Sequence, residues 1–437
     1  MNRTRAIVIA GALLAAMLAG VLLRSGQDPV PVVTVPQGVP PLPDVVAAAG
    51  DGPILAWSAR SEGRFEPCGC VAGMYGGLVR RATLLARVPQ DRLLSLELGG
   101  WSPGAEDHQR LRGPAYLAGL RAAGIDAVAL GKPEAALGAE ALAGHLAAAA
   151  SAGIAVVCAN LEGVAVRAWV PVEAGGRTWA VTSVVPDRAP AGPGLRLRDP
   201  AAALRPVLAA GLPVLVMADM DEAGLRALAA AVPSLDLVVG GDVQGPTTEP
   251  EPVGRVRVLH VANHGKSIGW WPVGGDRLRF ELIADTIPDH PGVRAVERTH
   301  QGTLARTALA IDRPAADAGW VGSQTCMGCH QGAHATWAAS RHAHAHEALV
   351  RKGMDADPDC LRCHVTGLGQ GGHRRLSGPG PLAAVTCESC HGPGRDHIAA
   401  PGPGTMVPVS PATCVGCHDA ENSPRFDYTT YWPRIAH

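Results

Sequence analysis

The sequence predicts a sandwich-like α/β domain followed by a smaller, mostly irregular helical domain, with a transmembrane helix at the N-terminus. Three observations lead to this fold class. Short β-type runs alternate with Ala/Leu-rich stretches up to about residue 285, a pattern typical of βαβ units and a largely parallel sheet. Beyond residue 319 this periodicity fades, and eight of the 11 cysteines lie between Cys326 and Cys417. An unbroken apolar run extends from Ala6 to Leu23.

The N-terminal run has the features of a membrane anchor. Arg3 and Arg5 precede it and Arg24 follows it. It is longer than the roughly 7–15 apolar residues of a signal peptide and close to the roughly 20 that span a bilayer. We therefore predict an uncleaved anchor within residues 1–25, with a cleaved signal as the alternative. Positive charge before the run places the body on the periplasmic side of the cytoplasmic membrane.

Composition then divides the rest of the chain. Six prolines in residues 26–45 indicate a stiff, extended linker. The α/β domain is predicted over 46–285, a connector with one helix (Val293–Ala310) over 286–318, and the Cys/His-rich domain over 319–437. The formal net charge of −1 gives no charge excess that would indicate a nucleic-acid partner.

Alternation of apolar runs locates the elements of the α/β domain. The predicted strands are Ile54–Ser58, Leu93–Leu98, Ala127–Leu130, Ala155–Ala159, Ala180–Val185, Val214–Ala218, Leu235–Gly240 and Val256–Ala262. The predicted helices between them include Leu78–Val88, Glu134–Ala152 and Glu222–Ala231.

The C-terminal domain contains four Cys-x-x-Cys-His motifs. Two thiols at this spacing bond to the vinyl groups of one haem, and the adjacent imidazole reaches its iron. The motifs therefore predict four covalently attached c-type haems. The predicted haem-binding thiols are Cys326, Cys329, Cys360, Cys363, Cys387, Cys390, Cys414 and Cys417, and the predicted proximal iron ligands are His330, His364, His391 and His418.

Other uses of paired cysteines explain the motifs less well. Zinc sites use two such pairs per ion, but they give no reason for a histidine after every second cysteine. Thioredoxin-like pairs occur singly at a strand-to-helix turn, and structural disulfides are not confined to this spacing.

Distal iron ligands must come from the seven other histidines of this domain. Two of the four candidates, His342 and His344, lie in a short helical stretch just past the first motif. A third, His397, follows a Gly-Pro-Gly turn after His391, and His437 ends a segment rich in Tyr and Trp. On a regular helix His342 and His344 cannot face one iron. The remaining three are interpreted as solvated loop histidines: His334, His346 and His373.

Residues 319–437 resemble the tetrahaem cytochrome c family, whose best-known member accepts electrons from hydroxylamine oxidoreductase in ammonia oxidisers. The stretches that carry this resemblance are Trp337–Ala345, Cys360–Gly369, Cys387–His397 and Cys414–His437. The resemblance implies closely packed haems, most of them with two histidine ligands, and leaves one iron as a candidate for an open position. It does not imply the same electron donor.

The α/β region is similar to calcineurin-like metallophosphoesterases, close to bacterial 5′-nucleotidases. The stretches that carry this similarity are Leu94–Gly100, Gly124–Gly138, Val157–Leu161, Leu235–Gln244 and Val261–Gly269. The resemblance implies a two-metal site with Asp-x-His, Gly-Asp, Gly-Asn-His and later histidines. This chain departs from that pattern at Ser58-Ala59-Arg60, Leu98-Gly99-Gly100, Gly131-Lys132-Pro133, Met217-Ala218-Asp219 and Gly241-Asp242-Val243-Gln244.

A two-metal site needs several convergent carboxylate and imidazole ligands. Asp219 and Asp242 alone cannot supply them, so we expect a degenerate domain without phosphohydrolase activity. Cys68 and Cys70 lie in a Gly-rich turn, where a metal, a redox contact, a partner site or a plain buried loop are all open interpretations. Cys158, within an apolar strand, is expected to be an inert core cysteine.

We therefore expect a membrane-tethered periplasmic protein that transfers electrons between redox partner proteins through four haems. Two alternatives belong to other classes. One is a haem enzyme that converts a small nitrogen or sulfur species at an open iron, and the other is an active metal-dependent phosphohydrolase with an appended cytochrome domain.

Overall fold

The computed structural model describes residues 43–67, 74–243, 245–262, 264–313 and 316–437. The predicted anchor and the two cysteines of the Gly-rich turn, Cys68 and Cys70, lie outside these residues. Within the described part of the chain, no helix is both long and apolar enough to cross a bilayer.

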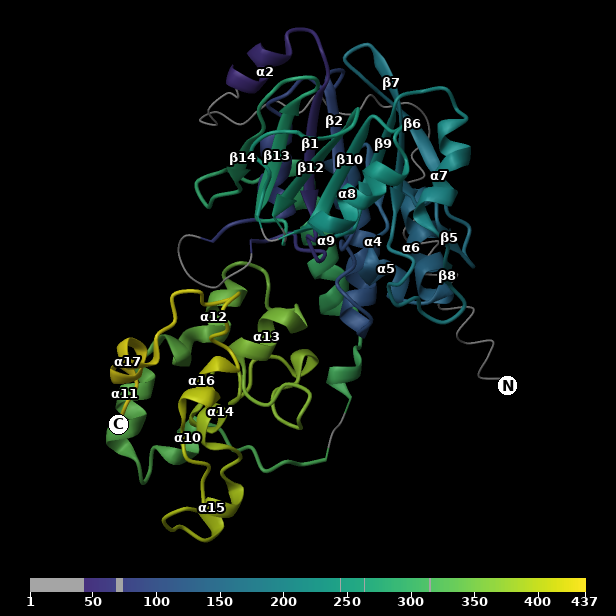
Figure 1. Cartoon of the computed structure of the whole chain (residues 1–437). Coiled ribbons are helices and arrows are strands. Elements are labelled where there is room, and N and C mark those ends of the chain that lie inside the picture. The colour runs from purple at the N-terminus through teal and green to yellow at the C-terminus, as the bar shows by residue number, and fades with distance from the viewer. Residues whose placement is uncertain (1–42, 68–73, 244, 263, 314–315) are drawn as a thin grey trace. The chain divides into compact units, whose positions relative to one another are not determined.

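Two six-stranded sheets form the α/β domain (Figure 1). The first sheet has the order β14-β13-β1-β2-β3-β4. Strands β1 to β4 run parallel to one another, β13 pairs antiparallel with β1, and β14 pairs antiparallel with β13. Its strands are β1 (Ile54–Ala59), β2 (Leu93–Leu98), β3 (Ala127–Ala129), β4 (Ala155–Val157), β13 (Ser267–Pro272) and β14 (Arg279–Leu282).

The second sheet has the order β11-β12-β10-β9-β7-β6, with antiparallel strands only at its two edges. Its strands are β6 (Trp169–Ala174), β7 (Arg177–Val184), β9 (Val214–Ala218), β10 (Leu237–Val243), β11 (Glu251–Val253) and β12 (Val256–Ala262). A separate two-stranded ribbon joins β5 (Leu161–Glu162) to β8 (Arg196–Leu197).

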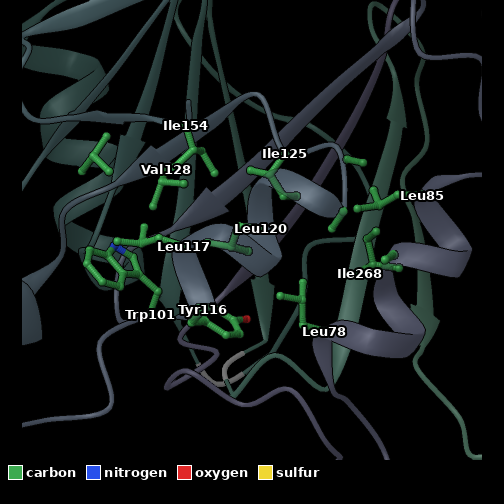
Figure 2. Close-up of a cluster of buried hydrophobic side chains, with 14 of the residues drawn as sticks. Leu78, Leu85, Trp101, Tyr116, Leu117, Leu120, Ile125, Val128, Ile154 and Ile268 are labelled. Carbon is green, nitrogen blue, oxygen red and sulfur yellow. The ribbon is translucent and has the colours of Figure 1, made fainter. Parts of the chain in front are cut away.

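The two sheets pack face to face with helices on both outer sides. Side chains alternate along β1, so Leu55 and Trp57 enter a core shared with the second sheet while Ile54 and Ala56 face the outer helices. Figure 2 shows the outer core of the first sheet, where helix residues such as Leu117 meet strand residues. These helices are α3 (Leu78–Leu85), α4 (Asp107–Ala122), α6 (Ala139–Ala152) and α9 (Pro291–Arg306). Helices α7 (Pro200–Leu208) and α8 (Glu222–Ala231) cover the second sheet.

The predicted α/β class is confirmed, but one largely parallel sheet is replaced by two mixed ones. Periodicity missed the antiparallel edge strands because no helix separates them from their neighbours. The predicted helix Glu134–Ala152 is also two helices, α5 (Lys132–Ala136) and α6. Gly138 breaks it with a φ of 88°, and the N–H of Ala139 donates to Pro193 O at 2.9 Å.

The ends of the α/β domain also differ from expectation. A short helix, α2 (Pro43–Ala49), begins within the predicted linker. Helix α9 stops at Arg306, and a 3-10 turn, η1 (Ala310–Asp312), follows it.

The C-terminal region is built from short helices and loops, as predicted. Its helices are α10 (Ser323–Cys326), α11 (Gln331–Ala338), η2 (Arg341–His344), α12 (Ala345–Val350), α13 (Pro358–His364), η3 (Arg375–Ser377), α14 (Cys387–His391), α15 (Arg395–Ala399), α16 (Pro411–Val415), α17 (Tyr428–Tyr431) and η4 (Trp432–Arg434). Its own apolar core is small and centres on Leu349, Leu361 and Val365. A domain with so small a core needs another source of cohesion, which covalent cofactors can supply.

Candidate haem centre and an ion-pair cluster

Each Cys-x-x-Cys-His motif folds as one helical turn. The N–H of His330 donates to Cys326 O at 3.0 Å, and that of His418 donates to Cys414 O at 2.9 Å. Residues i, i+3 and i+4 of a helical turn share one face. Both thiols and the imidazole of each motif therefore lie on the same side, which is the arrangement that thioether attachment and iron binding require.

Three of the four motif imidazoles face a second imidazole from elsewhere in the chain. The ring centroids of His330 and His397 are 6.0 Å apart, and those of His391 and His437 are also 6.0 Å apart. His418 and His342 are 6.2 Å apart. Two imidazoles that bind one metal ion from opposite sides, with metal–nitrogen bonds of about 2 Å, hold their ring centres roughly 6 Å apart. The chain therefore provides three spaces of the size that an iron needs.

Hydrogen bonds at Nδ1 orient several of these rings. The imidazoles of His364 and His437 lie with Nδ1 at 2.7 Å from Ala345 O and 2.9 Å from Ile435 O. Because a carbonyl only accepts, each Nδ1 must carry the proton, which leaves Nε2 with the lone pair that a metal binds.

Two further rings are held by hydroxyl groups. His397 Nδ1 lies 2.5 Å from Thr405 Oγ1, and that hydroxyl donates its own proton to Gly402 O at 2.7 Å. His397 is therefore the donor in its contact with Thr405. His418 Nδ1 lies 3.2 Å from Ser423 Oγ.

Burial keeps several of these imidazoles neutral. It is the main reason that the pKa values of His342, His391 and His418 lie below the usual range, and neighbouring imidazoles add to the effect at His342 and His391. Since iron binds the neutral form of imidazole, this environment suits the ligand role.

The second motif differs from the other three. Among the described residues, no histidine ring pairs with that of His364 in the way the three facing pairs do. The predicted distal candidate His344 lies with Nδ1 at 3.1 Å from Glu347, and its side chain is 56% exposed. An iron at this motif would have one histidine ligand from the chain.

Two histidines interpreted from the sequence as solvated are instead brought together. The ring centroids of His346 and His373 are 5.7 Å apart, and His373 is only 5% exposed. Burial, with His346 as a further cause, lowers the pKa of His373 to about 4. No motif or spacing in the sequence predicts that His346 and His373 meet. His334 packs against Trp337.

Thiols from different motifs lie next to one another. Cys363 lies next to Cys417, and Cys326 next to Cys387, close enough for the side chains of each pair to interact. Cys390 lies close enough to Cys414 for the two to interact electrostatically. The second and fourth, first and third, and third and fourth attachment sites are therefore neighbours.

The residues at which the α/β domain departs from the metal-ligand motif also converge. Arg60 donates to Asp242 at 3.0 Å, and the Lys132 ammonium binds the other oxygen of the same carboxylate. The backbone N–H of Lys132 donates to Asp219 at 2.6 Å. Burial raises the pKa of Asp219, whereas Lys132 and Arg60 outweigh burial and lower that of Asp242. Two cationic side chains thus occupy a region where metal ions need anionic and imidazole ligands.

A buried carboxylate holds these loops together. Glu134 accepts hydrogen bonds from the backbone N–H groups of Gly100, Ser102 and Gly131 at 2.9, 2.6 and 2.8 Å. Burial nevertheless dominates and raises the pKa of Glu134 to about 7. With its oxygens committed to backbone donors, Glu134 is a structural group of this site.

The C-terminal region and the α/β domain are similar to different known proteins. The family model described as cytochrome c554 and c-prime matches residues 325–392. Cytochrome c-554 of Nitrosomonas europaea is 39% identical over 98 residues, which cover 19% of this chain and 42% of that protein. The chain thus spans less than half the length of this relative.

Solved structures resemble the α/β domain. A sulfate thiohydrolase from Thermus thermophilus, solved with glycerol, is 16% identical with a TM-score of 0.50 over 61% of each chain. A 5′-nucleotidase precursor from the same organism is 21% identical, with a TM-score of 0.49 over 58% of this chain and 59% of the other. At these identities the likeness to the thiohydrolase concerns the fold alone.

Proposed function

We propose that this protein transfers electrons through four covalently bound c-type haems on the periplasmic side of the cytoplasmic membrane. The observation that carries the proposal is that three motif imidazoles each face a second imidazole about 6 Å away. A haem iron supplies one-electron redox chemistry when bound. An iron with two histidine ligands has no free position for a substrate, so such a centre is suited to electron transfer.

The proposed ligand set follows from the facing rings. The first haem uses His330 with His397, the third His391 with His437, and the fourth His418 with His342. Neighbouring thiols support close contact between these haems, which favours electron exchange among them.

The second haem supports a second candidate function. His364 is held in the tautomer that binds iron, but no described histidine ring faces it. An open iron there would bind a small nitrogen or sulfur species, and the other three haems would then supply or remove electrons.

A redox titration followed by visible spectroscopy tests both functions. We expect four haem centres, about three of them low-spin, with one high-spin centre that binds carbon monoxide when reduced. Four low-spin haems that bind no carbon monoxide would exclude the open-iron function, so that electron transfer would be the remaining candidate. A protein that takes up zinc in place of haem would overturn the proposal.

The α/β domain is proposed to serve as a scaffold or docking surface for a redox partner protein. The Arg60, Lys132 and Asp242 cluster supports this role, because it leaves too few metal ligands for hydrolysis. The apolar run Ala6–Leu23 is proposed to tether the protein to the membrane.

A further inference from the structure

Helix α4 of the α/β domain contacts the helix that carries the second haem motif. Asp357 is the N-cap of α13, and Asp359 directly precedes the haem-binding Cys360. Arg112 on α4 donates to Asp357 at 2.7 and 3.0 Å and to Asp359 at 2.6 Å. One guanidinium therefore holds both carboxylates at the start of α13.

A second side chain of α4 joins this cluster, and Arg362 of α13 also donates to Asp359 at 2.9 Å. His108 Nε2 lies 3.0 Å from the Asp359 oxygen that Arg112 does not bind. Burial alone would raise the pKa of Asp359, but His108 and Arg112 hold it well below its usual range. Asp359 is thus a carboxylate whose charge is held by two groups from the α/β domain.

The contact is largely shielded from water. The side chains of Arg112 and Asp357 are 9% and 7% exposed, and that of His108 is 4% exposed. An apolar cluster lies beside it, formed by Leu304, Leu309 and Ala356 with Leu111 and Ile311. In such surroundings a charge acts over a longer distance and is screened less by salt than at the surface.

We propose that Arg112 is a positioning residue that sets the redox potential of the second haem, so that the α/β domain forms part of the outer shell of that haem. The inference rests on the proposed function. Reduction adds one negative charge to the haem, and a buried cation nearby stabilises the reduced form. Arg112 also lies close enough to Cys360 for the two to interact electrostatically.

The opposite signs of the clustered charges provide the test. In the full-length haem-loaded protein, Arg112→Gln should lower the potential of the second haem, whereas Asp359→Asn should raise it. Asp357→Asn should also raise it, and asparagine keeps the N-cap. Arg112→Lys retains the charge and should restore most of the potential. Arg226→Gln, which removes a 47% exposed arginine of α8, is the matched control and should change nothing.

Potentials are measured by spectroelectrochemical titration, and the second haem is identified as the one whose spectrum changes in His364→Met. The inference would be overturned if Arg112→Gln and Asp359→Asn shifted the redox potential of the second haem in the same direction. It would also be overturned if either variant shifted the potentials of all haems equally, since both outcomes would indicate a structural effect. Unchanged potentials with all haems attached would overturn it as well. Failure of the proposed function would give a different result from failure of this inference, because the wild-type protein itself would then lack haem.

Discussion

At the scale of single residues, the two nitrogens of an imidazole can have different roles: one accepts or donates the hydrogen bond that orients the ring, and the other is available to a metal. Nδ1 of His364, for example, binds a backbone carbonyl and so fixes the ring, while Nε2 remains for the metal. His397 reaches the same result through the hydroxyl of Thr405. The chain's own hydrogen bonds thus prepare both proximal and distal rings for iron.

The ring pairs make the axial ligands testable one at a time. His342→Met and His397→Met should each shift the potential of a single haem upwards, because a thioether ligand favours the reduced iron over a second imidazole. His344→Met serves as the control, since the His344 side chain is exposed and bound to Glu347. Redox titration with visible spectra measures the shift. A shift in the control, with both other variants unchanged, would contradict the proposed ligands.

Glu134 predicts a pH dependence of stability. Its folded-state pKa of about 7 lies above the ordinary value of 4.5, so the folded protein binds more protons than the unfolded chain between these two pH values. Stability from this group is fully present below pH 4.5 and is lost as the pH rises through 7. The loss is at most about 3 kcal/mol.

Denaturant unfolding of wild type and Glu134→Gln across this range measures the effect. The variant should show a flatter profile, because glutamine does not titrate. Glu140→Gln, at an exposed position of α6, should keep the wild-type profile. Parallel profiles for wild type and Glu134→Gln would show that Glu134 does not titrate in this window.

At the scale of elements, the carboxyl ends of parallel strands in both sheets bring the loops with Arg60, Lys132 and Asp219 together. Arg60 follows β1, Lys132 begins α5 after β3, and Asp219 follows β9. The fold therefore brings these loops together, and their side chains form ion pairs. This separation of fold from chemistry is the reason that fold likeness alone assigns no activity.

We predict that the protein does not hydrolyse phosphate esters. Lys132 and Arg60 supply positive charge where metal ions would need ligands, so added metal should find no two-metal site. The full chain, supplied with manganese, zinc or calcium, is assayed against nucleotides and simple esters beside an active 5′-nucleotidase. Metal-dependent turnover comparable to that enzyme would refute the prediction.

At the scale of the whole molecule, the apolar core of the C-terminal region is small, and we predict that haem attachment is part of its folding. Four helical turns present paired thiols and an imidazole on one face. Intact-mass analysis after export should therefore show four added haems. Fewer than three, or bound zinc, would contradict the central prediction, and Cys363→Ala with Cys360→Ala should remove one haem.

The N-terminal run predicts where the protein is found. Cells that express the full chain should retain it in the membrane fraction, with the body accessible to protease from the periplasm. A variant with residues 1–25 replaced by a cleavable signal is the control and should be soluble. If cells that express the full chain instead yielded a soluble periplasmic protein cleaved near Ser25, the protein would be a secreted form.

The sequence by itself determined the features that depend on short-range spacing. Cysteines at i and i+3 and histidine at i+4 fall on one face of a helical turn wherever that turn lies, so the prediction of four attachment sites needs only the spacing. The strand Val214–Ala218 was predicted with the same bounds that the structure has, because a continuous apolar run marks a buried parallel strand. Leu93–Leu98 was also predicted with its observed bounds, although it contains Ser95 and Glu97.

Only the tertiary structure decided which distant residues meet. His397 faces His330 rather than the nearby His391, and His342 faces His418, although it follows the first motif. Such pairs depend on the path of the chain through many loops, and no local pattern records that path. The contact of Arg112 with Asp357 has the same origin, since a buried ion pair between residues 245 positions apart forms only after both helices have packed.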